Sequence, residues 1–212
     1  IFEILQELTA SGLEFVVVGG YAVSAYKHRF SVDADIVVKR ADMEKFAQIL
    51  AKSRFVKTVS KRLENAYSSE FVRYEKGGEL PVSVDILVDA IGVRQTNAAF
   101  GYEMLRRLSA KKKIKGVEKE VTLLVPGKEL LVAMKLHSGR ATDLRDAAAL
   151  CKGLDFALLQ KVIRRGDIAP VKESIAKLGS RLTSFRKLSA VWRAISASCS
   201  AVGFGTTPQS AK

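Results

Sequence analysis

The sequence predicts an α+β fold, in which a mixed sheet with helices is followed by a C-terminal helical bundle. In the first part of the 212 residues, short β-branched runs alternate with stretches of helical periodicity. From Lys128 to Ile195 the apolar spacing is helical and is interrupted mainly by glycines. No apolar run approaches the ~20 residues that cross a bilayer, so we expect neither a transmembrane protein nor a membrane partner.

The change of pattern predicts a domain boundary near residue 126. We expect a sheet-containing domain over residues 1–126 and a helical domain over 127–198. Residues 199–212 are mostly small or polar and are expected to form a tail.

The elements expected in the first part are helices over 2–10, 21–26 and 42–52 and strands over 15–18, 33–38, 67–74 and 82–88. Asp42 is a suitable N-cap for the third helix. Gly77-Gly78 is typical of a hairpin turn between the last two strands.

The elements expected in the second part are a helix over 98–108, two short strands within 114–125, and helices over 130–137, 144–152, 156–164, 171–178 and 185–195. The helices are separated by glycines and by Pro170, which are common where a helix ends.

The cysteines and the N-terminus indicate a cytoplasmic protein. Cys151 and Cys199 are too few for a disulfide framework, which suits a reducing compartment. The chain opens directly into an amphipathic pattern, without the basic and apolar regions of a signal peptide. His28 and His137 have no partners at zinc spacing, and we expect both at the surface or beside a site.

The net charge of +13 is concentrated in the second half of the chain. Residues 1–100 hold 13 basic and 13 acidic residues, whereas 101–212 hold 22 basic and 9 acidic ones, including the run Lys111–Lys115. Such asymmetry is a feature of proteins that bind polyanions. The alternative is a solubilising helical surface, with the lysine run protecting a strand edge.

A pair of carboxylates, Asp33 and Asp35, lies two residues apart on an expected strand. The strand period of two puts both on one face of the sheet, where they would repel each other unless a cation lay between them. Carboxylate oxygens suit Mg²⁺, which often binds one or two carboxylates together with substrate phosphates. Alternatively, one Asp caps the strand and the other is simply exposed.

A third carboxylate, Asp85, is embedded in the apolar strand over 82–88. A buried carboxylate is costly unless it is paired or bound to metal. Asp89 would face the same way on an extended strand, but it falls at the strand end, where solvated Asp is common. Gly19-Gly20 follows another expected strand, and such a turn lets a backbone approach phosphate closely.

These residues resemble the motifs of the DNA polymerase β-type nucleotidyltransferase superfamily. The first block is Gly19-Gly20-x-Ala22, then Arg29-x-Ser31-x-Asp33-x-Asp35-Ile36, then Asp85. The second block is Leu130-Leu131-Val132-Ala133-Met134-Lys135-Leu136, then Gly139-Arg140, then Asp143-Leu144-x-Asp146. The Arg-x-Ser form of the first block is similar to AbiEii-type and minimal nucleotidyltransferases of toxin–antitoxin systems. The resemblance covers roughly residues 13–152.

The resemblance implies a polymerase β-like fold and two-metal transfer of a nucleoside monophosphate from an NTP. Asp33, Asp35 and Asp85 would be catalytic and would ligate Mg²⁺, or Mn²⁺ in its place. Asp85 would also help to deprotonate the acceptor hydroxyl. Gly19 and Gly20 would hold the triphosphate through backbone N–H groups.

The resemblance also assigns roles to residues around these carboxylates. Lys135 would be catalytic by neutralising the triphosphate, although it could be an ordinary solvated lysine. Nucleotide binding would further involve Arg29, Ser31 and Arg140. Asp143 and Asp146 are acids at an expected helix start, and on the family pattern they would support the site by orienting Lys135 or Arg140.

The leading functional hypothesis is nucleotide transfer to RNA, with tRNA as the first candidate, by a toxin that has an antitoxin protein as partner. The basic second half favours a nucleic acid acceptor. Two alternatives remain: the same chemistry on a protein or a small molecule, and a nucleotide- or nucleic-acid-binding module without catalysis.

Overall fold

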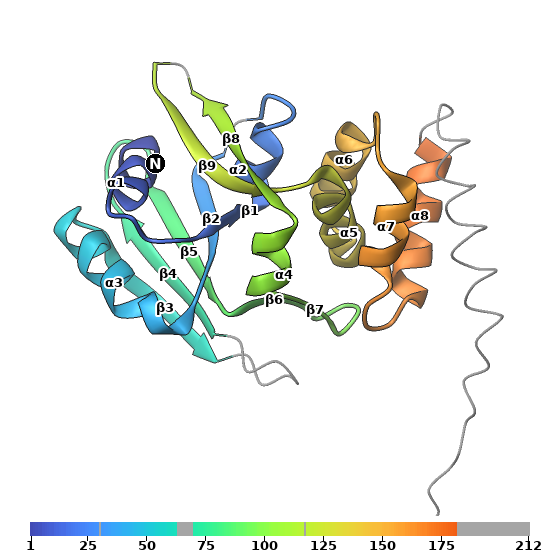
Figure 1. The fold of residues 1–212 in the computed structure, drawn as a ribbon, viewed down its shortest axis with the longest axis horizontal. Helices are drawn as coiled ribbons and strands as arrows, with labels where there is room; N and C mark the ends of the chain where they lie inside the picture. The colour runs from blue at the N-terminus through green and yellow to red at the C-terminus, as the bar shows by residue number, and fades with distance from the viewer. Residues whose placement is uncertain (30, 63–69, 117, 182–212) are drawn as a thin grey trace, which may run out of the picture.

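Figure 1 shows a mixed sheet with its helices and, beside it, a group of helices formed by the later part of the chain. This computed structural model describes residues 1–29, 31–62, 70–116 and 118–181. The α+β class predicted from the sequence is confirmed. Among the helices of the described ranges, none has the length and apolarity needed to cross a bilayer.

The central sheet has five strands in the order β1-β2-β5-β4-β3. Their bounds are β1 Val16–Val18, β2 Asp33–Val38, β3 Val56–Arg62, β4 Glu70–Lys76 and β5 Val82–Val88. Strands β2 and β5 pair parallel, whereas the other neighbouring pairs of this sheet are antiparallel. The parallel pair lies in the interior of the sheet, where apolar side chains such as Ile36 and Ile86 are fully buried.

Two helices cover one face of this sheet. They are α1 (Phe2–Ala10) and α3 (Met43–Lys52), which follows the short 3-10 turn η1 (Arg40–Asp42). Leu5 and Leu8 of α1 and Phe46 and Leu50 of α3 are fully buried. This helical spacing of buried side chains is what the sequence predicts for amphipathic helices packed on a sheet. Asp42 occupies the N-cap position of α3, but its side chain makes no capping hydrogen bond.

Two small antiparallel ribbons flank the central sheet. One pairs β6 (Ala90–Val93) with β7 (Ala98–Gly101), and the other pairs β8 (Ser109–Lys115) with β9 (Glu120–Pro126). The six-residue helix α4 (Tyr102–Arg107) connects the two ribbons, and α2 (Gly19–Ser24) follows β1 directly.

The later part of the chain is helical after β9. Its helices are α5 (Lys128–Ser138), α6 (Ala141–Leu150), α7 (Phe156–Ile163) and α8 (Ala169–Arg181). Residues 130–137 of α5 are all buried, because α6, α7 and α8 pack around this helix. Gly139 ends α5 in the left-handed conformation at φ 65°.

The helix predicted over residues 98–108 is only partly present. Residues 98–101 form β7 instead, because their backbone pairs with β6 in a hairpin that the sequence pattern did not reveal. Strands β3 and β6 were also not predicted. The expected helix over 185–195 and the tail over 199–212 lie outside the described residues, as do the first residues of the strand expected over 67–74.

Candidate active site

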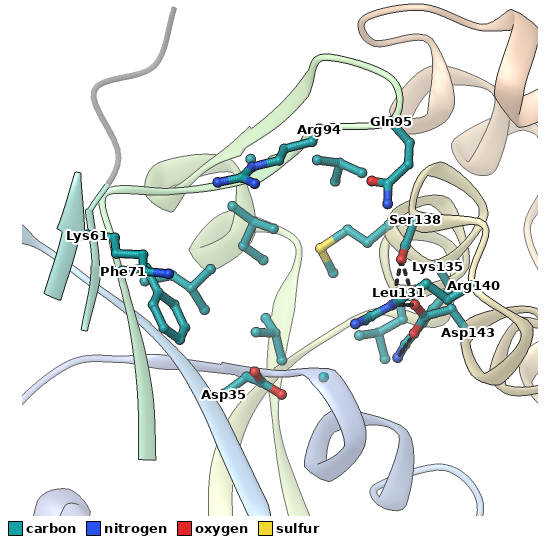
Figure 2. A pocket seen from close by; sticks show the side chains of 17 residues that line it. Asp35, Lys61, Phe71, Arg94, Gln95, Leu131, Lys135, Ser138, Arg140 and Asp143 are labelled. Atoms are coloured by element: carbon teal, nitrogen blue, oxygen red, sulfur yellow. Dashed lines mark hydrogen bonds and ion pairs between the residues drawn. The ribbon is translucent and has the colours of Figure 1, made fainter. Parts of the chain in front are cut away.

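The parallel pairing of β2 with β5 brings two of the three predicted carboxylates together. Asp35 and Asp85 are register partners on these neighbouring strands, and Asp33 lies opposite Ser83. Directly opposed side chains project from the same face of a sheet. Residues 50 positions apart in the sequence therefore meet at one point, with Asp35 on the floor of a cleft (Figure 2).

The environment of Asp35 disfavours its charge. Burial and then the nearby Asp85 carboxylate raise the pKa of Asp35 from 3.8 to about 6, against an opposing effect of Lys135. Although the residue keeps some exposure at the cleft surface, its carboxyl group is poorly hydrated. A bound cation would stabilise the ionised form of such a group more than that of a well-hydrated carboxylate.

Gly19 makes room for Asp35. It has φ 62°, and a Cβ placed on it would lie 1.8 Å from Oδ2 of Asp35. No side chain can occupy that position, and a left-handed φ independently favours glycine. The turn from β1 into α2 therefore lies directly against the carboxylate that forms the cleft floor.

Asp85 is engaged by an arginine that the sequence analysis did not single out. Arg73 on β4 donates from Nε to Oδ1 of Asp85 at 2.8 Å and from Nη2 to Oδ2 at 2.7 Å. Asp85 is 5% exposed, so this two-point ion pair supplies the partner that a buried carboxylate needs. The predicted turn at Gly77-Gly78 could have identified Arg73, because the hairpin register that pairs β4 with β5 places Arg73 opposite Asp85.

The remaining acids of this region differ from each other. Asp33 is exposed, and its Oδ1 accepts a hydrogen bond from Ser83 Oγ at 2.9 Å. Asp89 does not continue the face of Asp85, because β5 ends at Val88 and Asp89 adopts φ 64°. Its carboxylate instead binds the backbone N–H and the guanidinium of Arg40.

The cleft has a volume of about 460 Å³ and combines apolar with cationic walls. Figure 2 shows Lys61 and Phe71 on one side of Asp35, Lys135 and Arg140 on the other, and Arg94 across the opening. Lys61 and Arg94 were not predicted as site residues, since neither belongs to a recognisable motif. A cleft with this lining suits a ligand that carries both a flat apolar group and several negative charges.

Lys135 is buried and is not a solvated helix lysine. Its Nζ lies 2.6 Å from Asp143 Oδ1 and 3.0 Å from Asp146 Oδ2. Burial opposes the charge of Asp143, but hydrogen bonds from Lys135, Ser138 and Arg140 together hold its pKa below the ordinary value. Both acids therefore fix the position of the Lys135 ammonium at the wall of the cleft.

The loop after α2 joins the same network. Arg29 forms an ion pair with Asp146, and a Cβ on Gly20 would lie 3.4 Å from its guanidinium carbon and 2.8 Å from Ser31 Oγ. Gly20 therefore lets Arg29 and Ser31 pack close to α2. Through Asp146, the loop that precedes β2 is connected to Lys135 on α5.

The donor set around Asp35 has the chemistry that Mg²⁺ requires, because its side chains are carboxylates from adjacent strands. In residues 1–29, 31–62, 70–116 and 118–181, however, no three acidic, His or Cys side chains form a ready-made metal-binding group. Asp85 is held by Arg73 and Asp33 by Ser83. A metal ion that bound all three carboxylates would have to share or displace these partners.

His137 is buried, which excludes the first of its two expected placements, the surface, and leaves the second, beside a site. It is 1% exposed, and its Nε2 lies 2.9 Å from the carbonyl oxygen of Ile163 while Nδ1 lies 2.8 Å from Thr96 Oγ1. It therefore connects α5 with α7 and with the β6–β7 turn.

The fold matches solved nucleotidyltransferase structures. The solution structure of the antibiotic-resistance factor ANT(2'')-Ia aligns over 84% of this chain and 92% of its own, with TM-score 0.50 and 12% identity. The crystal structure of ANT(2'')-Ia with adenylyl-2''-tobramycin aligns over 84% and 94%, with the same TM-score and identity. The lincosamide adenylyltransferase LnuA with bound lincomycin aligns over 71% and 94%, at TM-score 0.46 and 18% identity. At these identities the likeness shows the fold alone. No family model and no curated protein sequence matches the chain.

Proposed function

We propose that this protein is a Mg²⁺-dependent nucleotidyltransferase, which transfers a nucleoside monophosphate from an NTP to a hydroxyl group. The observation that carries the proposal is the register pairing of Asp35 with Asp85 beside the Gly19 turn. This pairing sets Asp85 beside Asp35, which lies on the floor of a cleft whose walls hold Lys135 and Arg140. Asp33 and Asp85 are not among the residues that line the cleft. The nucleotidyltransferase fold supports the same reading.

In this proposal Asp33, Asp35 and Asp85 hold the divalent metal ions. When bound, the metals would neutralise the phosphates and stabilise the entering and leaving oxygens of an in-line displacement. Asp85 would also accept the proton of the acceptor hydroxyl. The new bond joins the acceptor oxygen to the α-phosphorus, and pyrophosphate leaves.

The other predicted residues would bind the nucleotide or support its binding site. Gly19 and Gly20 would bring backbone close to the phosphates, and Arg29 and Ser31 would support that turn. Arg140, which is 70% exposed along its side chain, can reach a phosphate while it still contacts Asp143 at 2.5 Å. Lys135 would contribute a fixed positive charge, positioned by Asp143 and Asp146.

We propose RNA as the acceptor, with tRNA as the first candidate. The support is the charge of the chain: residues 101–212 carry 22 basic and 9 acidic residues, while the part that holds the carboxylates is neutral. On this view the protein acts as the toxin of a toxin–antitoxin pair, and a second protein would neutralise it. Growth arrest on expression of wild-type protein, but not of Asp35→Asn, would test the toxin role.

The activity is tested by incubation with α-labelled NTPs, Mg²⁺ and total tRNA. Wild-type protein should label the RNA, and Asp33→Asn, Asp35→Asn and Asp85→Asn should each lose at least about a hundredfold in rate. Asp89→Asn is the matched control, because the Asp89 carboxylate contacts Arg40 and not Asp35, and Asn tolerates its positive φ. Full Mg²⁺-dependent transfer by Asp33→Asn or Asp35→Asn would refute the metal assignment.

A small-molecule acceptor is the second candidate. The specific observation in its favour is the fold, because the matching ANT(2'')-Ia structure contains adenylyl-2''-tobramycin. The same assay with an aminoglycoside or a lincosamide in place of tRNA separates the two. Label on the antibiotic and none on RNA would replace the RNA proposal.

A further inference from the structure

A second hollow lies on the far side of the Lys135 network from the cleft. It has a volume of about 290 Å³ and lies between the end of α2 and the helix α6. Its lining includes Lys27, His28, Arg29 and Arg145. Asp146 also lines it, but this carboxylate is already paired with both Arg29 and Lys135.

The cationic side chains of the hollow are available to a ligand. Lys27, His28 and Arg145 are exposed, and within the described residues none of them has an ion-pair partner. Exposed cations concentrated around a concave surface attract anions more strongly than the same charges dispersed over a convex one.

The loop after α2 extends this positive surface toward the β8–β9 ribbon. Lys112 of β8 lies 5.3 Å and Lys128 of α5 lies 5.9 Å from the ring centre of Tyr26. Tyr26 is held in place by a hydrogen bond from its hydroxyl to the carbonyl oxygen of Pro126, at 2.8 Å. Glu129, an acid that acts electrostatically on Tyr26, accepts a hydrogen bond from the backbone N–H of Asp155.

Five side chains from four separate segments therefore converge around one loop. They are Lys27, His28, Lys112, Lys128 and Arg145, which we call the basic loop surface. Figure 1 shows the loop after α2 between the β8–β9 ribbon and α6. The surface adjoins the active-site wall, because Arg29 lines the hollow and packs on Gly20, next to Gly19 and Asp35.

We propose that the basic loop surface binds the phosphate backbone of the acceptor RNA, an inference that rests on the proposed function. Cations spaced along a surface match a chain of phosphates. Phosphate contacts fix position and not sequence. The surface would therefore hold the RNA near the cleft and leave the choice of nucleotide to the cleft itself.

The test measures RNA binding in the absence of NTP, so that it does not depend on catalysis. Fluorescein-labelled total tRNA is titrated with wild-type protein and with Lys27→Gln/Arg145→Gln at several salt concentrations. Each lost phosphate contact lowers the slope of log affinity against log salt by about 0.9. The double variant should bind about tenfold more weakly at 0.1 M salt and lose close to two units of slope.

The matched control is Lys57→Gln/Lys161→Gln, which removes the same charge from exposed positions on β3 and α7. Its RNA affinity should stay within about twofold of the wild type. Equal losses of RNA affinity in both double variants would mean that only net charge matters. That result would refute the proposed RNA-binding role of the basic loop surface. Unchanged binding by Lys27→Gln/Arg145→Gln would also overturn it.

The same set of proteins separates this inference from the proposed function. If wild-type protein labels tRNA while Lys27→Gln/Arg145→Gln labels and binds it equally well, only the basic loop surface is wrong. Wild-type protein that binds no RNA but labels an antibiotic would refute both the RNA-binding role of the surface and RNA as the acceptor. The proposal that the protein is a nucleotidyltransferase would remain.

Discussion

At the scale of single residues, the central feature is a carboxylate in a place that disfavours its charge. Asp35 faces Asp85 across the parallel pair and lies against the backbone of Gly19. Burial and the neighbouring Asp85 carboxylate both disfavour the ionised form of Asp35 when no cation is bound. On the proposed function, activity and stability therefore oppose each other at this position.

Asp35→Asn should stabilise the metal-free protein above pH 6. The folded-state pKa of Asp35 is raised from 3.8 to about 6, so its ionised form destabilises the native state. The cost develops as pH rises from 4 through 6 and reaches about 3 kcal/mol when the shift is converted. Urea unfolding at pH 5 and pH 8 in EDTA measures it. An Asn variant no more stable than wild type at pH 8 would contradict this account.

Gly19→Ala should destabilise the protein by about 2–4 kcal/mol, from the positive φ and the contact with the Asp35 carboxylate. Gly12→Ala is the control, because Gly12 also has positive φ but would find no atom within 4 Å of its Cβ. It should cost only about 1 kcal/mol. Equal losses in urea unfolding would show that φ alone matters at residue 19.

The contacts of single residues were only partly accessible from the sequence. Spacing on a strand predicted that Asp33 and Asp35 share a face, and the motif order brought Asp85 into the same site. Arg73 was missed because a lone arginine on a strand carries no motif. Its contact with Asp85 depends on the β4–β5 register, and the turn between these strands was visible in the sequence.

At the scale of elements, α5 and α6 are joined by a buried network and not only by apolar packing. Lys135 is held by Asp143 and Asp146, and these acids bind Arg140 and Arg29 in turn. The network connects the helices to the loop that precedes β2. It therefore couples the position of the helices to the position of β2, which carries Asp35.

Lys135→Met should destabilise the protein by about 3 kcal/mol, because it leaves two buried acids with fewer partners. Lys161→Met on the exposed face of α7 should change stability by no more than about 0.5 kcal/mol. Thermal and urea unfolding of both variants provide the measurement. If the two substitutions changed the free energy of unfolding equally, the Lys135 ion pairs would not contribute to stability.

Helices and strands were predicted well where the spacing of apolar residues determines the element. They were predicted poorly where pairing with another strand determines it. The helices after residue 128 and the strands over 33–38 and 82–88 follow directly from their spacing. Residues 98–101 have a helical spacing of apolar groups but form β7, since their partner strand β6 decides the outcome. The weakly apolar β3 was missed because it is an exposed edge strand with little to bury.

At the scale of the whole molecule, one buried histidine connects the helices to the β6–β7 ribbon. His137 on α5 contacts Thr96 beside the β6–β7 ribbon and Ile163 at the end of α7, and its ring packs edge-on against Phe100. The sequence offered no sign of this role, because the partners of His137 come from segments far from it in the chain.

Stability should fall as pH drops below about 6.5 because of His137. Burial lowers its pKa in the native state, so the unfolded chain takes up a proton that the folded one does not. Its contribution is complete above pH 6.5 and is lost as pH falls toward the lowered pKa. His137→Asn should be less stable at pH 7.5 and less sensitive to pH between 7 and 5. The opposite effect of Asp35 on stability is present in both proteins, so it cancels in the difference between variant and wild type. If stability depended on pH equally in His137→Asn and wild type, His137 would not be the cause.

The pairing of Arg73 with Asp85 also bears on the order in which the chain folds. Strands β4 and β5 are joined by the short connection 77–81, whereas β2 and β5 are joined by residues 39–81. Short loops close at lower entropic cost and usually earlier. The β4–β5 hairpin can therefore form first, with the guanidinium already beside Asp85. When β2 docks, Asp35 approaches a neutralised carboxylate, so the chain avoids bringing two bare negative charges together in the middle of its sheet.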